Sequence, residues 1–177
     1  MKKLILPIAI ALLANGCTSE SPTTGTTKDN VSDISNALVK SACNAISSDD
    51  IVSSKTVQAQ QISGTAQLTS STSVGSAGGK TSGAAIKVNT ECEGEVSGQT
   101  ILVSFSARSN DSVSMKVSYS TNDVGNSGWK SFDLNDQFKT YSFEYDVPAR
   151  STPGADFIGF LPLTGSAAVK NVSITMG

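Results

Sequence analysis

GWKSFDLNDQFKTYSFEYDVPA, residues 128–149, decides the fold class of this chain. Tyr141, Phe143 and Tyr145 lie two residues apart in it, with polar residues between them. A period of two is typical of a β-strand that has one buried face. The polar turn NDQ joins this segment to a shorter run at 130–134, so the stretch predicts two antiparallel strands that form a hairpin.

The same stretch holds most of the aromatic side chains of the protein. It contains Trp129, the only tryptophan, and no Phe, Tyr or Trp occurs in the chain before Phe105. One face of a sandwich strand must be buried, and aromatic pairs across neighbouring strands are its usual filling. We therefore expect most of these rings to form the core.

Two further segments with a period of two come earlier in the chain, at 101–108 and 112–119. Turn-forming residues such as Ser-Gly and Asn-Asp separate these segments from weaker apolar runs. The weaker runs cover 56–62, 65–74, 83–89, 130–134, 157–163 and 167–175. Residues 55–177 are therefore predicted to form an all-β domain of about nine strands without a second helix, an antiparallel β-sandwich or jelly roll.

The N-terminus has the features of an export signal. Lys2 and Lys3 precede an apolar run that is too short to span a bilayer, so residues 1–16 are predicted to be a signal peptide. The four residues Ala14-Asn15-Gly16-Cys17 resemble a bacterial lipobox. This resemblance implies that Cys17 carries lipid and anchors the protein to a membrane. Ala14 and Gly16 also satisfy the small-x-small rule of ordinary signal peptides, so a secreted or periplasmic form is the alternative.

Residues 17–29 are rich in Ser, Thr, Gly and Pro and are predicted to be a flexible tether. A coil of this length would hold the domain roughly 20 Å from its anchor. Thr18, rather than Asp, follows the cysteine, and in the lipoproteins that this start resembles this implies the outer membrane of the bacterial envelope.

Residues 30–48 have apolar side chains at a spacing of three to four, which predicts an amphipathic helix packed on the sandwich. Asn30 is its expected N-cap. The chain has three cysteines, and lipidation of Cys17 would leave Cys43 and Cys92 free to form a disulfide. Such a bond would stabilise the folded protein by about 4 kcal/mol, because closing the loop lowers the entropy of the unfolded chain.

Composition excludes several function classes. The chain has no histidine, which removes Ser-His-Asp catalysis and His-ligated metals. A formal net charge of -2 gives no basic field for nucleic acid. No pair of carboxylates stands out as a catalytic pair, and Glu91, Glu93 and Glu95 are expected to form a solvated acidic edge rather than a calcium site. We expect no enzyme activity and no metal.

Three runs of the C-terminal half resemble the carbohydrate-binding modules of the galactose-binding-like β-sandwich class. They are GQTILVSFSARSNDSVSMKVSYS at 98–120, WKSFDLNDQFKTYSFEYDVP at 129–148 and DFIGFLPLTGSAAVKNVSI at 156–174. The resemblance implies the sandwich fold and polysaccharide binding. The family often has an Asp in the final strand that helps to ligate a structural calcium; this chain has Lys170 and Asn171 there, so no cofactor is expected.

Sugar binding of this kind needs exposed flat rings and polar side chains nearby. The candidate carbohydrate-binding residues are Trp129, Tyr119, Tyr145, Asn122, Asp123, Asn126 and Arg150. For each ring core packing is the alternative, and the polar candidates are also ordinary turn residues. We expect a non-catalytic, lipid-anchored protein that binds a polysaccharide or envelope glycan. The alternative is a structural or protein-interaction lipoprotein of the same fold that has no sugar site.

Overall fold

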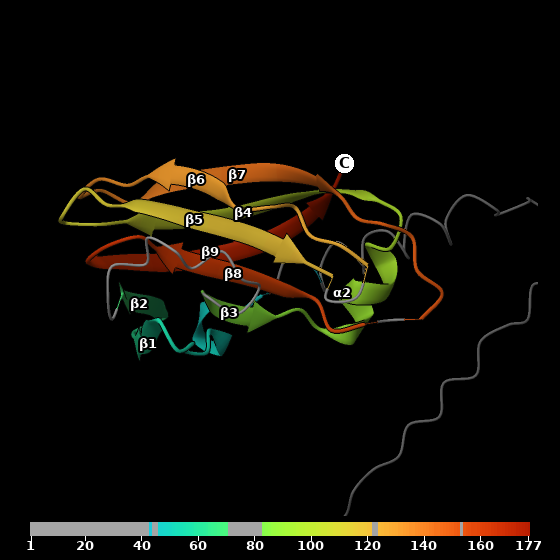
Figure 1. The fold of residues 1–177 in the computed structure, drawn as a ribbon, viewed down its shortest axis with the longest axis horizontal. Helices are drawn as coiled ribbons and strands as arrows, with labels where there is room; N and C mark the ends of the chain where they lie inside the picture. The colour runs from blue at the N-terminus through green and yellow to red at the C-terminus, as the bar shows by residue number, and fades with distance from the viewer. Residues whose placement is uncertain (1–42, 44–45, 71–82, 122–123, 153) are drawn as a thin grey trace, which may run out of the picture.

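The computed structural model describes residues 43, 46–70, 83–121, 124–152 and 154–177. These residues form two antiparallel sheets packed face to face (Figure 1). One sheet has five strands in the order β1-β2-β9-β4-β7, and the other has four in the order β3-β8-β5-β6. The strands are β1 (Val57–Ile62), β2 (Thr65–Ser70), β3 (Ala84–Lys87), β4 (Thr100–Arg108), β5 (Ser114–Ser120), β6 (Lys130–Asp133), β7 (Lys139–Asp146), β8 (Phe157–Pro162) and β9 (Ser166–Met176).

This arrangement confirms the predicted all-β sandwich, and each of the nine strands overlaps a segment that the sequence indicates. The strand order is not sequential. β9, the last strand, lies between β2 and β4 in the centre of the five-stranded sheet. Figure 1 shows β5 and β8 side by side in the four-stranded sheet, in agreement with their register from Met115↔Pro162 to Ser120↔Phe157.

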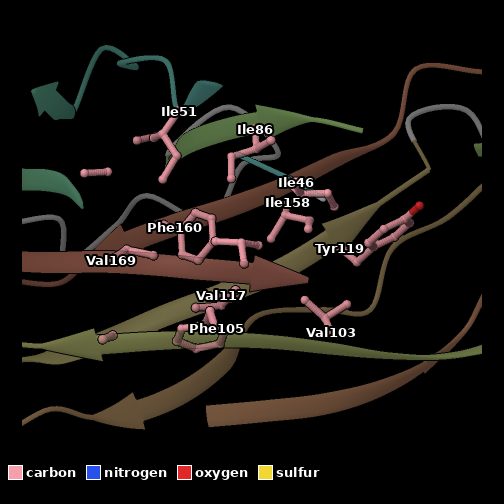
Figure 2. Packing of buried hydrophobic residues seen from close by; sticks show 14 of the residues in the cluster. Ile46, Ile51, Ile86, Val103, Phe105, Val117, Tyr119, Ile158, Phe160 and Val169 are labelled. Carbon is pink, nitrogen blue, oxygen red and sulfur yellow. The ribbon is translucent and has the colours of Figure 1, made fainter. Parts of the chain in front are cut away.

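The core lies between the two sheets and is centred on Phe105 of β4. Its ring centroid lies 5.2 Å from that of Phe132, 5.7 Å from that of Phe160 and 5.7 Å from that of Tyr141. These rings come from both sheets, so they join the two layers directly. Figure 2 shows two of them, Phe105 and Phe160, close together in the core. The expectation that most aromatic side chains fill the core is therefore confirmed, because the inward face of each strand must leave water.

A short helix, α2 (Thr90–Glu95), was not predicted and packs at one end of the sandwich (Figure 1). The side chain of Asn89 caps it by accepting a hydrogen bond from the Cys92 amide at 2.8 Å. The expectation of a solvated acidic edge is wrong for Glu93, which is only 1% exposed and points into the protein, whereas Glu91 and Glu95 are exposed. Asn89 followed by acidic residues in the first turn is the sequence signal of this helix start.

The signal peptide and the tether lie outside the described residues, as does most of the predicted helix at 30–48. Cys43 is helical and forms the expected disulfide with Cys92 of α2. The helix does not extend to residue 48 as predicted. Ser47 is extended, and its side chain accepts a hydrogen bond from Asp49 to start the separate 3-10 helix η1 (Ser48–Asp50). Within the described part of the chain, no helix is long and apolar enough to cross a bilayer.

Candidate functional site

The outer face of the four-stranded sheet is built from the residues that alternate with the core positions. Ser118 of β5 pairs with Gly159 of β8, which pairs with Ala85 of β3. Beyond β3, Val52 forms an isolated bridge with Ala85, with N–H to carbonyl distances of 2.9 and 3.0 Å in the two directions. Ser118, Gly159 and Ala85 have small side chains, so they leave a depression in the sheet surface along this row.

A trough of about 560 Å³ lies over this row. One wall is the segment 52–55, which includes the exposed Val52 and Lys55. Its floor includes Ala85, Ser118 and Gly159, and the half-buried ring of Phe157 lines it in the next row. The volume lies in the range of small-molecule pockets, and the lining combines a ring and small apolar groups with hydroxyls and an ammonium group.

Trp129, which directly precedes β6, is not one of the residues that line the trough, but its indole lies next to Gly159 of the trough floor. A Cβ added to Gly159 would lie 3.2 Å from Cη2 of the indole and 3.6 Å from the Ser118 hydroxyl oxygen. The indole therefore reaches across β5 to β8, and the missing side chain of Gly159 makes room for it. The ring is half-buried and packs against the core cluster, which agrees with the core alternative. Its role in sugar binding stays a prediction.

Asn126 lies near the end of this surface. It is exposed and forms an isolated bridge with Ser120, which also lines the trough. Its side-chain oxygen accepts a hydrogen bond from the Gly128 amide at 2.9 Å, so part of its hydrogen-bonding capacity holds the turn before Trp129. The predicted residues Asn122 and Asp123 fall outside the described residues.

The structure places Tyr119 and Arg150 inside the protein, and we therefore remove them from the candidate sugar-contacting residues. Tyr119 is 0% exposed, and its hydroxyl donates to Oδ2 of Asp156 at 2.6 Å. The Arg150 guanidinium forms an ion pair with Asp156 and donates to the Glu93 carbonyl oxygen at 2.8 Å. Both side chains are therefore held in a buried polar network, and only a small part of the Arg150 side chain, 6% exposed, reaches the surface.

This buried polar network, made of Tyr119, Arg150, Asp156 and Glu93, joins α2 to the sandwich. Oε1 of Glu93 accepts the Asp156 amide at 3.0 Å, which ties the helix to the start of β8. Burial raises the pKa of the Tyr119 phenol well above its usual range, and the hydrogen bond to Asp156 adds to this. Hydrogen bonding to Asp156 raises the pKa of the Arg150 guanidinium.

Tyr145 lies at the same end of the sandwich, apart from the trough. Its ring centroid lies 5.8 Å from that of Tyr119, and the ring is half-buried. Burial raises the pKa of its phenol, while a hydrogen bond with Thr121 opposes the shift. A hollow of about 330 Å³ lined by Thr121, Val124 and Arg150 lies at this end. The Tyr145 hydroxyl lies near Gly125, which directly precedes Asn126: a Cβ added to Gly125 would lie 3.3 Å from it.

Several residues of the trough were missed by the sequence reasoning. Phe157 and Gly159 lie in an apolar run in which the expectation was only a strand, and Lys55 lies in a loop without a motif. A glycine inside a strand signals the close approach of another group, and Gly159 carries that signal. Among the described residues, no group of three or more Asp, Glu, His and Cys could hold a metal ion.

Comparisons with known proteins give fold neighbours and no family. No family model and no curated protein matches the sequence. Among solved structures, the ligand-free module BiXyn10A CBM1 is 17% identical, with a TM-score of 0.48 over 73% of this chain and 85% of that chain. A family 29 carbohydrate-binding module complexed with cellulohexaose is 12% identical, with a TM-score of 0.45 and coverage of 68% and 75%.

The xylan-binding domain CBM22-1 of Xyn10C from Paenibacillus barcinonensis is 10% identical, with a TM-score of 0.43 and coverage of 68% and 80%. These three neighbours are carbohydrate-binding modules. At such identities and TM-scores, the fold of this chain rests on its own strand order and register.

Proposed function

We propose that this protein binds a neutral polysaccharide strand in the trough on the outer face of the four-stranded sheet. The observation that carries the proposal is the position of the Trp129 indole, which reaches across β5 to Gly159 in the floor of a trough of about 560 Å³. The C–H face of a pyranose packs favourably on an aromatic ring, and an indole offers the largest ring available to a protein.

The remaining groups of the trough suit the other parts of a sugar. Ser118 and Ser120 place hydroxyls on the floor, where they can exchange hydrogen bonds with sugar hydroxyls. Lys55 adds three N–H donors at the opposite wall, and Phe157 adds a second ring. All of these are binding groups, and the proposal includes no catalytic step.

We further propose that lipid at Cys17 anchors the protein to the outer membrane. The support is the resemblance of residues 14–17 to a lipobox and the polar composition of residues 17–29. Lipid display would place many copies of a weak binding site on one surface, which raises avidity for a polymer. Incorporation of a labelled fatty acid that Cys17→Ser abolishes tests the anchor separately from sugar binding; release of an unlabelled protein into the medium would support secretion instead.

The trough is tested by affinity electrophoresis in gels that contain cellulose derivatives, xylan, mannan or galactan. Wild type should be retarded by at least one of these neutral polymers, and Trp129→Ala should weaken binding about tenfold, the scale of one lost stacking contact. Phe138→Ala removes a ring from the opposite sheet and is the matched control, which should leave this binding unchanged.

Two outcomes contradict the proposal. Retardation that Trp129→Ala leaves intact would remove the trough as the site. Wild type that binds none of the neutral polymers would favour the structural or protein-interaction alternative.

A further inference from the structure

A second surface, on the outer face of the five-stranded sheet, gathers positive charge around one ring. Nζ of Lys170 in β9 lies 4.1 Å from the ring centroid of Phe138, which precedes β7. Cζ of Arg108, at the end of β4, lies 5.1 Å from the same centroid. A cation is attracted to the face of an aromatic ring, so Phe138 holds both cations at fixed positions on this face.

Neither cation has a carboxylate partner among the described residues, where the only ion pair is that of Arg150 with Asp156. Arg108 donates from NH1 to the Asp136 carbonyl oxygen at a long distance of 3.5 Å. Its Nε is buried and has no hydrogen-bond partner in the described part of the chain. Two like charges on one ring repel each other, and an anion placed between them would relieve that repulsion and use the donors that remain.

Acidic residues do occur nearby, but none of them forms an ion pair with Arg108 or Lys170 in the described part of the chain. Asp111 lines a shallow hollow together with Arg108, and Asp136 contributes its backbone carbonyl rather than a carboxylate oxygen to that side chain. Glu144 of β7 lies further along the sheet, opposite Leu102 of β4. The positive charge is therefore concentrated at the end of the sheet where Phe138 lies.

Rows of hydroxyl groups continue from the cations across the same face. Ser106 pairs with Thr140 on one side and with Lys170 on the other, and the Ser106 and Thr140 oxygens are 3.3 Å apart. Further along the strands, the next row of residues on this outer face consists of Ser142, Ser104 and Ser173. A ligand that matches this face carries negative groups and many hydroxyls.

We propose that this second surface, defined by Phe138, Arg108, Lys170 and Thr140, binds an acidic polysaccharide. A carboxylate or sulfate of the sugar accepts hydrogen bonds from Lys170 and Arg108, and sugar hydroxyls bond to the exposed Thr140. Ser106 is only 8% exposed and lies beside the Thr140 hydroxyl as a neighbour, not as a ligand contact. This surface lies on the other sheet from the trough, so the inference extends the proposed function and does not depend on the trough.

A polysaccharide fits this face better than an anionic bilayer does. Peripheral membrane binding adds apolar side chains that enter the interface to the attraction between charges. The large apolar residues that are exposed in the described part of the chain are Val52, Ile62 and Val124, and none of them belongs to the second surface. The hydroxyl rows, in contrast, are the groups that a sugar chain uses.

Polygalacturonate and its methyl-esterified form separate charge from sugar identity, because esterification removes the carboxylates and keeps the chain. Alginate and chondroitin sulfate provide two further acidic probes. Wild type should bind at least one acidic polymer, should lose that binding as salt increases, and should not bind the esterified form through this surface. The double variant Arg108→Gln, Lys170→Gln should bind about tenfold or more weakly.

The control variants keep the result independent of folding. Lys130→Gln removes an exposed lysine of β6 in the other sheet and should leave the affinity unchanged. The pair Arg108→Lys, Lys170→Arg keeps both charges and should retain binding, while thermal melting of every variant verifies a folded protein. Trp129→Ala should keep acidic-polymer binding, so failure of the trough and failure of this surface give different patterns.

Three results overturn the inference. They are a wild type that binds none of the acidic polymers, equal binding by the double glutamine variant, and loss of acidic-polymer binding in Trp129→Ala. Binding to phosphatidylglycerol vesicles that depends on Lys170, without binding to any acidic polymer, would assign the surface to a membrane and overturn it as well.

Discussion

The hydroxyl of Tyr119 donates to Oδ2 of Asp156 at 2.6 Å, and both side chains are completely buried. Asp156 also receives two hydrogen bonds from Arg150, so one carboxylate joins β5, the segment after β7 and the start of β8. Figure 2 shows the ring of Tyr119 in the core cluster, with its oxygen directed away from Phe105 and Phe160. The ring serves the core, and its hydroxyl serves the buried polar network.

Stability should fall at high pH because Tyr119 cannot ionise in the folded state. Burial raises its pKa in the folded protein, whereas the unfolded phenol ionises near pH 10. The contribution is fully present below about pH 10, and above it the unfolded state binds fewer protons, so the free energy of unfolding should decrease by about 1.4 kcal/mol per pH unit. Urea unfolding at several alkaline pH values measures the slope.

Tyr119→Phe should flatten that slope, since the variant has no phenol to ionise. Tyr141→Phe is the matched control: its hydroxyl donates to the Asp133 carbonyl oxygen near the surface, and it should change the slope less. Equal alkaline slopes in wild type and Tyr119→Phe would contradict the assignment.

Asp156→Asn should destabilise the protein strongly. The substitution keeps the size of the side chain but leaves the Arg150 charge buried without its partner, which typically costs about 3–5 kcal/mol. Asp133→Asn, an exposed carboxylate of β6, should change the free energy of unfolding by less than about 0.5 kcal/mol. Chemical denaturation of both variants decides the matter, and similar midpoints for the two would remove the ion pair from the stabilising network.

Gly159→Ala should move the Trp129 indole away from β8. The added methyl would lie 3.2 Å from Cη2, so the ring must shift by a few tenths of an ångström or more. Trp129 is the only tryptophan, and its fluorescence reports the change directly. We expect emission at a longer wavelength and weaker binding of the neutral polymer, with acidic-polymer binding unchanged. An unaltered emission spectrum would show that the ring does not depend on the space above Gly159.

Reduction of the disulfide should lower stability and loosen the contact between Cys43 and α2. The two cysteines are 49 residues apart, and closing such a loop stabilises a protein by about 4 kcal/mol on the chain-entropy argument. The double variant Cys43→Ser, Cys92→Ser should unfold at a lower denaturant concentration than oxidised wild type. It should also be insensitive to a reductant that shifts the wild-type midpoint; an equal response of both proteins to the reductant would contradict this.

Two of the predicted sugar-contacting rings, Tyr119 and Trp129, show what a sequence pattern cannot reveal. The structure buries Tyr119 completely and leaves Trp129 half-buried. Tyr119 and Trp129 both lie close to polar loops in the sequence, and a period of two assigns each a face of a strand. Only the pairing of β5 with β8 brings Asp156 to the hydroxyl of Tyr119, and only that pairing puts Gly159 under the indole of Trp129. Both partners are about thirty or more residues away, and no local pattern indicates them.

By itself, the sequence determined the class of the fold and the approximate place of each strand, and it indicated the pairing of Cys43 with Cys92 on the condition that Cys17 carries lipid. The alternation of polar and apolar side chains is a local property, and cysteines can be counted, so both can be read from the sequence alone. Only the tertiary structure decided the order of the strands, the burial of Glu93, the ion pair of Arg150 with Asp156, and the meeting of Lys170 and Arg108 on the ring of Phe138. These features depend on contacts between distant segments, which sheet pairing creates and which neighbouring residues do not specify.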